Sequence, residues 1–238
     1  MGYAGGNNVG IRYALKNFSP QYIWILNNDT VVATNSLQNL IARMEEDSDI
    51  GLCGATILYA DVPNLVQSYA GGRFSAWRGR SIHAGWHAAA DAIIDPKAVE
   101  SQLGFINGAC VLASRRFLEV VGLMEERYFL YYEEPNWGAR AKGRFKLGYA
   151  ADAIVRHKVG RSIGTGDFGD RSLLSEYYLR RNRVRFCTEF SPLSLPIVAF
   201  DTLKTFALCL ARGQRRRAWI VIAASLGVRF DHDTLARG

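Results

Sequence analysis

The pattern of hydrophobic and polar positions divides the chain into short apolar runs separated by polar turns. Tyr22–Leu26 is a run of five apolar or aromatic residues. A run without alternation indicates a strand buried on both faces, so we expect parallel neighbours on both sides. The run ends at the turn-forming sequence Asn27-Asn28-Asp29-Thr30. Ligands of open α/β sheets bind at the carboxyl ends of strands, so Asp29 is a candidate ligand for a hard cation. A simple turn that caps the next helix is the alternative.

The same pattern predicts most of the other elements. Leu37, Leu40, Ile41 and Met44 lie on one face of a helix that begins at Asn35 or Ser36 and ends near residue 46. Ser114 is expected to cap a short helix that Gly122 ends. Strands are predicted at 51–58, 105–113, 146–150 and 153–157, and a further short helix at 11–17.

Three stretches lack a clear period. Residues 2–10 hold four glycines, which allow close approach of the backbone to a ligand or indicate a frayed terminus. Residues 60–103 are irregular, basic and aromatic, and they form either an acceptor groove or a surface excursion; His83 and His87 within them are interpreted as structural. Residues 158–171 also hold four glycines, which predicts a mobile loop that closes on a ligand.

Composition and charge narrow the classes of partner. The 238 residues are 49% hydrophobic with a net charge of +7, which fits one α/β domain with an appendage and an anionic partner. The basic residues form no nucleic-acid-binding motif, so we expect a nucleotide diphosphate or an anionic lipid and no nucleic acid. Cys53, Cys110, Cys187 and Cys209 are scattered, which predicts free buried thiols in a reducing compartment.

Two adjacent carboxylates follow an aromatic run. Glu133 and Glu134 come directly before Pro135, a residue that suits the first turn of a helix. The helix dipole stabilises acids at this position, which is one explanation for the pair. The other is a general base, because a carboxylate against an aromatic wall can accept a proton from a hydroxyl.

The tail after residue 191 has two apolar runs, 193–210 and 218–228. Asp201 and Lys204 interrupt the first run, and four arginines lie between 212 and 217. We expect both runs to be too short to span a bilayer. Apolar helices beside an arginine cluster fit the surface of an anionic membrane, and a helical pair packed on the domain is the alternative.

Six motifs in order resemble one family. They are Gly-Tyr-Ala-Gly-Gly-Asn-Asn-x-Gly at 2–10, Leu-Asn-Asn-Asp-Thr at 26–30, Gly-Ala-Cys-Val-Leu-Ala-Ser-Arg-Arg at 108–116, Val-Gly-Leu-Met-Glu-Glu-x-Tyr-Phe-x-Tyr-Tyr-Glu-Glu at 121–134, Val-x-His at 155–157 and Tyr-Tyr-x-x-Arg-Asn at 177–182. Together they resemble the family 2 glycosyltransferases, especially the rhamnosyltransferase-like branch. The resemblance implies a GT-A fold, a Rossmann-like mixed α/β sheet flanked by helices, over residues 1–190, followed by a helical tail over 191–238.

The resemblance also implies roles for individual residues. Asp29 and His157 match ligands of Mg²⁺ or Mn²⁺ on the donor's diphosphate. Glu134 matches the general base, with Glu133 beside it, although the family has aspartate at the position of Glu134 and an acid at that of Asn136. The implied donor-binding residues are Gly6, Asn8, Asn27 and Asn28, and the implied acceptor-binding residues are Asn107, Gly108, Trp137 and Arg140.

The implied function is inverting transfer of a sugar, with rhamnose as one candidate, from a nucleotide-diphosphate donor to a glycan or lipid-linked acceptor in cell-surface polysaccharide synthesis. The implied location is the cytoplasm, at the inner face of the plasma membrane. Family members begin with two strand–helix units that hold the nucleotide, so we expect an N-terminally incomplete domain and a Met1 that is internal to the ancestral protein. The alternative is an inactive remnant that acts as a membrane-peripheral binding module.

Overall fold

The computed structural model describes residues 1–158, 171–230 and 235, so most of the predicted ligand-closing loop lies outside the described residues. The chain divides into two compact units. The first contains Met1–Phe74, Ser81–Arg127 and Glu133–Val159, and the second contains Ser75–Arg80, Tyr128–Tyr132 and Gly160–Gly238.

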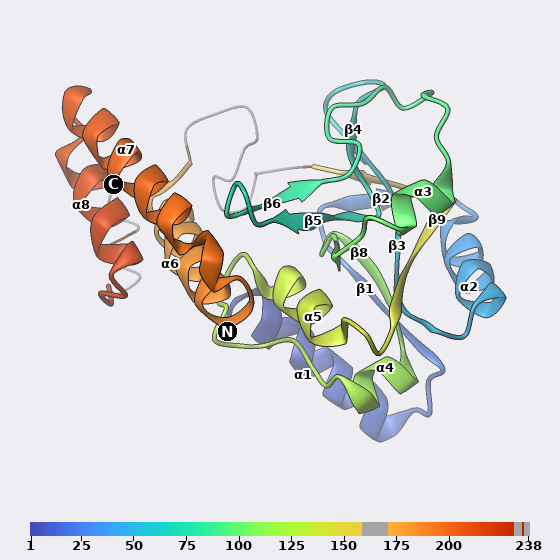
Figure 1. Ribbon diagram of the computed structural model, residues 1–238. Helices are drawn as coiled ribbons and strands as arrows, with labels where there is room; N and C mark the ends of the chain where they lie inside the picture. Colours follow the sequence, from blue (N-terminus) through green and yellow to red (C-terminus); the bar gives the residue numbers. More distant parts are fainter. Residues whose placement is uncertain (159–170, 231–234, 236–238) are drawn as a thin grey trace. The chain divides into compact units, whose positions relative to one another are not determined.

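The first unit is built on a mixed sheet (Figure 1). Its strand order is β1 (Tyr22–Leu26), β8 (Cys110–Ser114), β3 (Ile50–Tyr59), β9 (Lys146–His157) and β2 (Thr30–Val32), and β4 (Val66–Tyr69) also pairs with β3. β3 and β9 are parallel, whereas the other pairs in this sheet are antiparallel. A second sheet has the order β6 (Arg80–His83), β5 (Gly71–Ser75), β7 (Phe105–Ile106).

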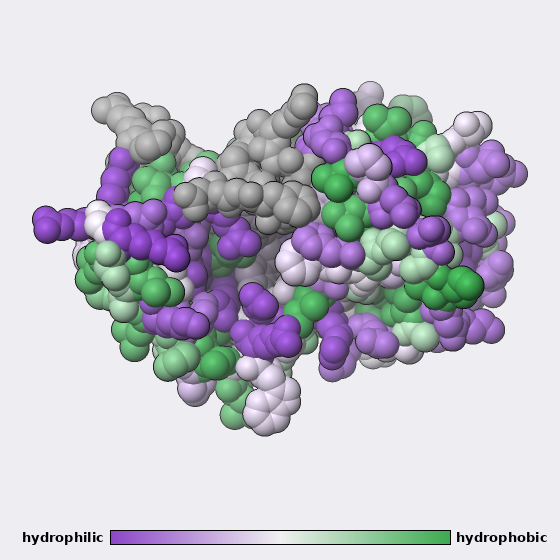
Figure 2. All heavy atoms as spheres, turned by 90° about the horizontal axis from the view of Figure 1, so that it is seen from above, coloured by the Kyte–Doolittle hydropathy of each residue, from purple (hydrophilic) through white to green (hydrophobic). Residues whose placement is uncertain are grey.

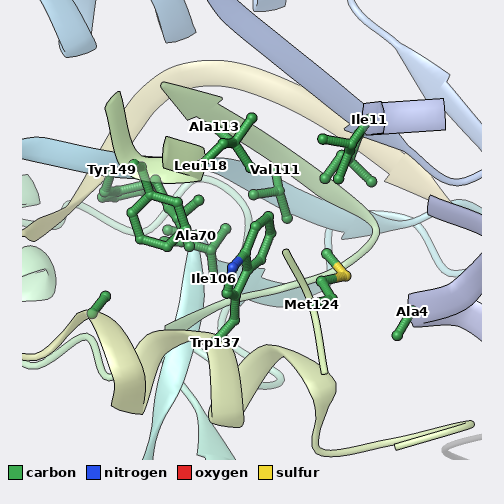
Figure 3. Packing of buried hydrophobic residues seen from close by; sticks show 14 of the residues in the cluster. Ala4, Ile11, Ala70, Ile106, Val111, Ala113, Leu118, Met124, Trp137 and Tyr149 are labelled. Atoms are coloured by element: carbon green, nitrogen blue, oxygen red, sulfur yellow. The ribbon is translucent and has the colours of Figure 1, made fainter. Parts of the chain in front are cut away.

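Helices cover both faces of the mixed sheet. α2 (Ser36–Glu46) packs Leu40 and Met44 against the side chains on one face of β3. On the other face, α1 (Gly2–Asn17), α4 (Arg115–Val120) and α5 (Glu133–Ala141) contribute Ile11, Phe117 and Trp137 to a larger cluster (Figure 3). α3 (Pro96–Glu100) is short and has no buried residue. The mixed α/β sheet flanked by helices that the GT-A resemblance predicted is confirmed.

The position of β1 differs from the prediction. Among the described strands β1 pairs only with β8, and that pairing is antiparallel, so the expectation of parallel neighbours on both sides is wrong. Ile25 belongs to the cluster on one face, and Trp24 packs against the cluster on the other. Both faces of this edge strand therefore meet apolar residues, which explains a run without alternation even though Leu26 is 36% exposed.

Two other boundaries are corrected. The helix expected at 11–17 begins at Gly2, because Ala4, Asn8 and Ile11 form a buried stripe whose packing outweighs the low helix propensity of glycine. The two strands expected at 146–150 and 153–157 are one strand, β9, whose register on β3 shifts between Ala55 and Thr56. The predicted elements α2, β3 and α4 are confirmed, including the Ser114 cap, which accepts from Phe117 N–H at 3.1 Å. The single strand expected at 105–113 is instead two strands in different sheets, β7 and β8, because a turn at Asn107 separates them.

The second unit contains α6 (Leu173–Phe190), a 3-10 turn (Pro192–Ser194), α7 (Leu195–Ala211) and α8 (Arg215–Ser225). The two tail helices are confirmed, and all four cysteines of the chain are free and buried, as predicted. The stretch Pro192–Ala211 has a mean hydropathy of 1.6 and, by length and composition alone, could cross a membrane. The expectation that every tail run is too short is therefore wrong for this stretch.

Candidate active site

Asp29 and His157 meet at one edge of the sheet. Asp29 lies in the turn between β1 and β2, and His157 ends β9, where it pairs with Thr30. Asp29 Oδ1 is 3.2 Å from His157 Nε2, and the main chain of Asp29 accepts from Lys158 N–H at 2.9 Å. The structure thus brings together the two residues that the resemblance assigned to a metal.

A glutamine sets the orientation of the His157 ring. Gln67, on β4, places its Oε1 2.9 Å from His157 Nδ1. An amide oxygen only accepts, so Nδ1 carries the proton and Nε2 keeps its lone pair in the neutral imidazole. That lone pair faces Asp29 Oδ1 and the Asn27 amide nitrogen, which is 3.4 Å away.

This arrangement fits a divalent cation. Asp29 Oδ1 is buried and has no hydrogen-bond partner among the described residues. Asp29 Oδ1 and His157 Nε2 are 3.2 Å apart, so they form an ion pair when the imidazole is protonated, and when it is neutral a cation beside them would satisfy both atoms. No group of three or more His, Cys, Asp or Glu side chains with metal-binding geometry exists in the part of the chain that the structure describes. Two protein ligands are sufficient for an ion that takes its other ligands from phosphates and water.

Glu134 is the second residue of α5, and the main chain of a neighbouring loop holds its carboxylate. Glu134 Oε1 accepts from Gly108 N–H at 3.2 Å. Burial raises the pKa of Glu134, and the backbone hydrogen bonds, including the one from Gly108, act in the opposite direction. Glu133 is buried, whereas the side chain of Glu134 is partly exposed. Glu134 is thus the less buried residue of the pair.

The loop 107–109 joins this carboxylate to the Asp29 turn. Gly108 O accepts from the Tyr3 hydroxyl at 2.6 Å, and Ala109 O accepts from Asn27 N–H at 3.2 Å. Asn107 Oδ1 accepts from Ala109 N–H at 3.0 Å and closes the turn. A Cβ at Gly108 would lie 2.6 Å from Glu134 Oε1 and 2.7 Å from the Tyr3 hydroxyl oxygen, so a larger residue there would displace these two side chains. Burial raises the pKa of Tyr3, and the charges of Glu134 and Glu133 raise it further, so Tyr3 stays a hydroxyl donor.

Two of the predicted contact residues are buried. Trp137 is 1% exposed in the apolar cluster of Figure 3, and its indole N–H donates to Gly122 O at 2.8 Å. Asn8 is buried and donates to Met124 O while accepting from Met124 N–H. Both side chains are buried and have structural partners, and the acceptor-binding role of Trp137 and the donor-binding role of Asn8 stay predictions.

The other predicted residues differ in exposure and in their hydrogen-bond partners. Arg140 donates to Val121 O at 2.8 Å and to Leu123 O at 2.6 Å, which fixes the turn before the Glu125–Glu126 pair. These bonds give Arg140 a structural role, and its acceptor role stays a prediction. Gly6 is exposed on α1 with open space around it, and Asn28 is exposed in the Asp29 turn. Donor binding by Gly6, Asn27 and Asn28 and acceptor binding by Asn107 and Gly108 stay predictions.

Sequence reasoning missed two members of the site. Tyr3 lies in the glycine-rich motif at 2–10, which was interpreted from its glycines alone, so the hydroxyl of Tyr3 was not predicted as part of the site. Gln67 lies in the stretch 60–103, which was expected to be irregular but contains β4. No local signal identifies Gln67, because its partner His157 is 90 residues away in the sequence.

The chain is similar in sequence to known proteins. The model of the family "Glycosyl transferase family 2" matches residues 1–122. The low-salt glycan biosynthesis hexosyltransferase Agl10 of Haloferax volcanii is 27% identical over 143 residues, which are 59% of this chain and 43% of that protein. The chain therefore spans less than half the length of this relative.

A solved structure is also similar. The mannosyltransferase PcManGT from Pyrobaculum calidifontis in complex with GDP-Man and Mn2+ superposes with a TM-score of 0.48 at 13% identity, covering 94% of this chain and 67% of that one. The family assignment is independent of this similarity. Because the family model matches 122 of the 238 residues, the chain belongs to glycosyl transferase family 2.

Proposed function

We propose that the protein transfers a sugar such as rhamnose from a nucleotide-diphosphate donor, with inversion, to a hydroxyl of a glycan or lipid-linked acceptor. The role is in cell-surface polysaccharide synthesis, in the cytoplasm at the inner face of the plasma membrane. Membership of glycosyl transferase family 2 and the relative from glycan biosynthesis support this proposal. Four free, buried thiols are consistent with a reducing compartment.

The observation that carries the proposal is the hydrogen-bonded connection between Glu134 and the Asp29 turn. Gly108 holds the Glu134 carboxylate, and the next residue, Ala109, accepts from Asn27 N–H. A proton acceptor and a candidate metal-binding pair are thus parts of one rigid main-chain arrangement. Inverting transfer needs such an arrangement, because the base and the leaving diphosphate lie on opposite sides of the reacting carbon.

The chemistry then follows from these residues. Asp29 and His157 would hold Mg²⁺ or Mn²⁺, which when bound neutralises the charge that develops on the leaving diphosphate. Glu134 removes the proton of the acceptor hydroxyl as its oxygen attacks the anomeric carbon from the face opposite the diphosphate. The C–O bond to the acceptor forms while the bond to the diphosphate breaks, so one displacement inverts the configuration. Gly108 N–H keeps the carboxylate oriented throughout.

The test separates catalysis from binding. Glu134→Gln keeps the size of the side chain but removes the base, so turnover should fall about 10²–10⁴-fold. The Kd for the nucleotide diphosphate, measured by calorimetry with Mn²⁺, should be unchanged because a base acts in the transition state. Glu46→Gln on the exposed end of α2 is the matched control and should turn over like the parent. Near-normal turnover of Glu134→Gln would remove Glu134 from this role.

A panel of nucleotide diphosphates and their sugars identifies the donor. Calorimetry with Mn²⁺ ranks the nucleotides, and product analysis by NMR reports the anomeric configuration. We expect a product whose configuration is opposite to that of the donor. Retention of configuration would contradict a single displacement with Glu134 as base.

A further inference from the structure

One face of α7 is apolar and exposed. Phe200, Leu203, Ala207 and Leu210 follow one another at helical spacing, and all four are exposed. Phe200 is 64% and Leu203 60% exposed, which is unusual for large apolar side chains clustered on one helix. The opposite face of α7 buries Val198, Thr202 and Cys209. Figure 2 shows hydrophobic residues beside hydrophilic ones on the surface of the tail helices.

The charge around this face is positive. Asp201 is the only acidic residue between 195 and 230, whereas six basic residues lie in the same interval. Asp201 Oδ2 accepts from Arg180 at 2.9 Å and from Arg183 at 2.6 Å, both on α6, so its charge is neutralised within the unit. Lys204 is exposed on α7, and Arg212, Arg215 and Arg216 are exposed at the turn that follows it.

We propose that this α7 face, defined by Phe200, Leu203, Ala207 and Leu210, docks on the surface of an anionic lipid bilayer. The apolar side chains would enter the boundary between headgroups and acyl chains, while the arginines contact anionic headgroups. Trp219, on α8 and 57% exposed, is an aromatic residue of the type that lies at this boundary. The proposal concerns binding alone and does not depend on transferase activity.

The observations favour a bilayer surface over two other occupants. A second copy of the chain would bring six basic residues from each partner together with no exposed acid from this interval to balance them. A helix that crossed the bilayer would carry Asp201 into hydrocarbon and lose its pairs with Arg180 and Arg183. Those pairs and the buried face of α7 hold the helix in the bundle with α6 and α8.

Co-sedimentation of the full chain with vesicles tests the proposal. The parent should bind vesicles of phosphatidylglycerol and phosphatidylcholine and bind pure phosphatidylcholine weakly. Replacement of Arg212, Arg215 and Arg216 by Gln should weaken binding by roughly fivefold per charge, or about a hundredfold in total. Replacement of Arg73, Lys142 and Arg144 by Gln is the matched control: it removes the same charge from exposed positions of the first unit and should leave binding nearly unchanged.

The apolar contribution needs its own variant. Phe200→Ser with Leu203→Ser should weaken vesicle binding at least tenfold, because each large apolar side chain contributes about 1.5–3 kcal/mol on burial. Circular dichroism checks that the helices remain. Parent protein that fails to bind anionic vesicles would overturn the proposal, as would equal losses in the control. Resistance to alkaline extraction, or light scattering that shows a dimer abolished by the apolar variant, would also overturn it in favour of a spanning helix or a second copy.

Discussion

At the scale of single residues, Glu134 and His157 are held in place by different kinds of contact. The Glu134 carboxylate accepts a hydrogen bond from the main-chain N–H of Gly108. Substitution of Gly108 keeps this N–H, but the added Cβ would lie 2.6 Å from Glu134 Oε1. The His157 ring is held by a side chain, that of Gln67. A substitution at Gln67 can therefore change the orientation of His157, whereas no substitution removes the main-chain donor to Glu134.

The metal pair makes a direct prediction. Asp29→Asn removes the only carboxylate of the Asn27–Thr30 turn, so divalent-dependent binding of a nucleotide diphosphate should be lost. His157→Ala should weaken the same binding less, because a neutral ligand contributes less than a charge. Calorimetry with Mn²⁺ and a nucleotide diphosphate measures both. Undiminished binding by Asp29→Asn would show that the metal binds elsewhere.

Gln67→Leu tests the orientation of His157. Without an acceptor at Nδ1 the ring should populate the other tautomer, and metal affinity should fall about 10–100-fold. Long-range ¹⁵N–¹H NMR reads the tautomer in the metal-free protein, independently of activity. Gln38→Leu, at an exposed position of α2, is the matched control. An unchanged tautomer in Gln67→Leu would assign the orientation to another contact.

The raised pKa of Glu134 has two consequences with opposite signs. The base must be ionised, so kcat/KM should rise through a pKa above that of an ordinary glutamate. The folded state, however, holds the proton more tightly than the unfolded chain, so stability falls as pH rises from the unfolded pKa through the folded one. Glu134→Gln should therefore unfold at a higher Tm than the parent at neutral pH, and a lower Tm would contradict this burial effect.

At the scale of elements, glycines decide how α5 is placed. A Cβ at Gly138 would lie 2.0 Å from Gly104 O, so α5 approaches that loop closely only because residue 138 has no side chain. Gly138→Ala should cost about 1–3 kcal/mol in the free energy of unfolding and displace Glu134, which lowers turnover. Denaturant unfolding and turnover measure the two effects. Unaltered stability would show that the helix shifts without penalty.

Gly6→Ala is the opposite case. A Cβ at Gly6 meets nothing within 4 Å, and the residue lies within α1. Alanine should therefore stabilise the protein by about 0.5–1 kcal/mol, measured by denaturant unfolding. The same variant tests the predicted donor contact of Gly6, since weaker nucleotide binding would indicate that the backbone there approaches the donor.

The elements that the sequence predicts correctly are those marked by residues within the element itself. α2, β3 and the Ser114-capped α4 follow from apolar spacing and a cap. The edge position of β1 did not, because both its faces meet apolar residues and the run looks like an interior strand. The first part of α1, residues 2–10, was missed because its stabilising contact, from Asn8 to Met124, spans 116 residues.

At the scale of the whole molecule, the second unit collects segments that are distant in sequence. Arg183 donates to Gly79 O at 2.6 Å, and Asn182 donates to Leu130 O at 2.8 Å. These bonds place the segments 75–80 and 128–132 with α6. Such long-range pairings leave no periodic signal, so the sequence predicts a helical tail but does not predict that the segments 75–80 and 128–132 belong to the same unit.

Asp201→Asn tests whether this unit has its own stability. The change removes the charge that pairs with Arg180 and Arg183, and we expect a loss of about 1–2 kcal/mol, discounted because the Asp201 side chain is 41% exposed. Hydrogen exchange should quicken in α6 and α7 while β3 keeps its protection. Asp61→Asn, exposed in the first unit, is the control. Equal acceleration in β3 would show that the two units unfold together.

The bond from Asn27 N–H to Ala109 O has a consequence for how such an enzyme diversifies. Because main-chain atoms make the connection, the exposed side chain at 28 can vary without moving Glu134 relative to the Asp29 turn, whereas the buried Asn107 closes that loop through its Oδ1. Because the side chain of Asn28 is exposed, substitutions there can change the donor preference with little loss of fold stability. A saturation library at Asn28 should yield altered sugar selectivity at nearly constant fold stability, which makes this position a starting point for evolving transferases with chosen donors.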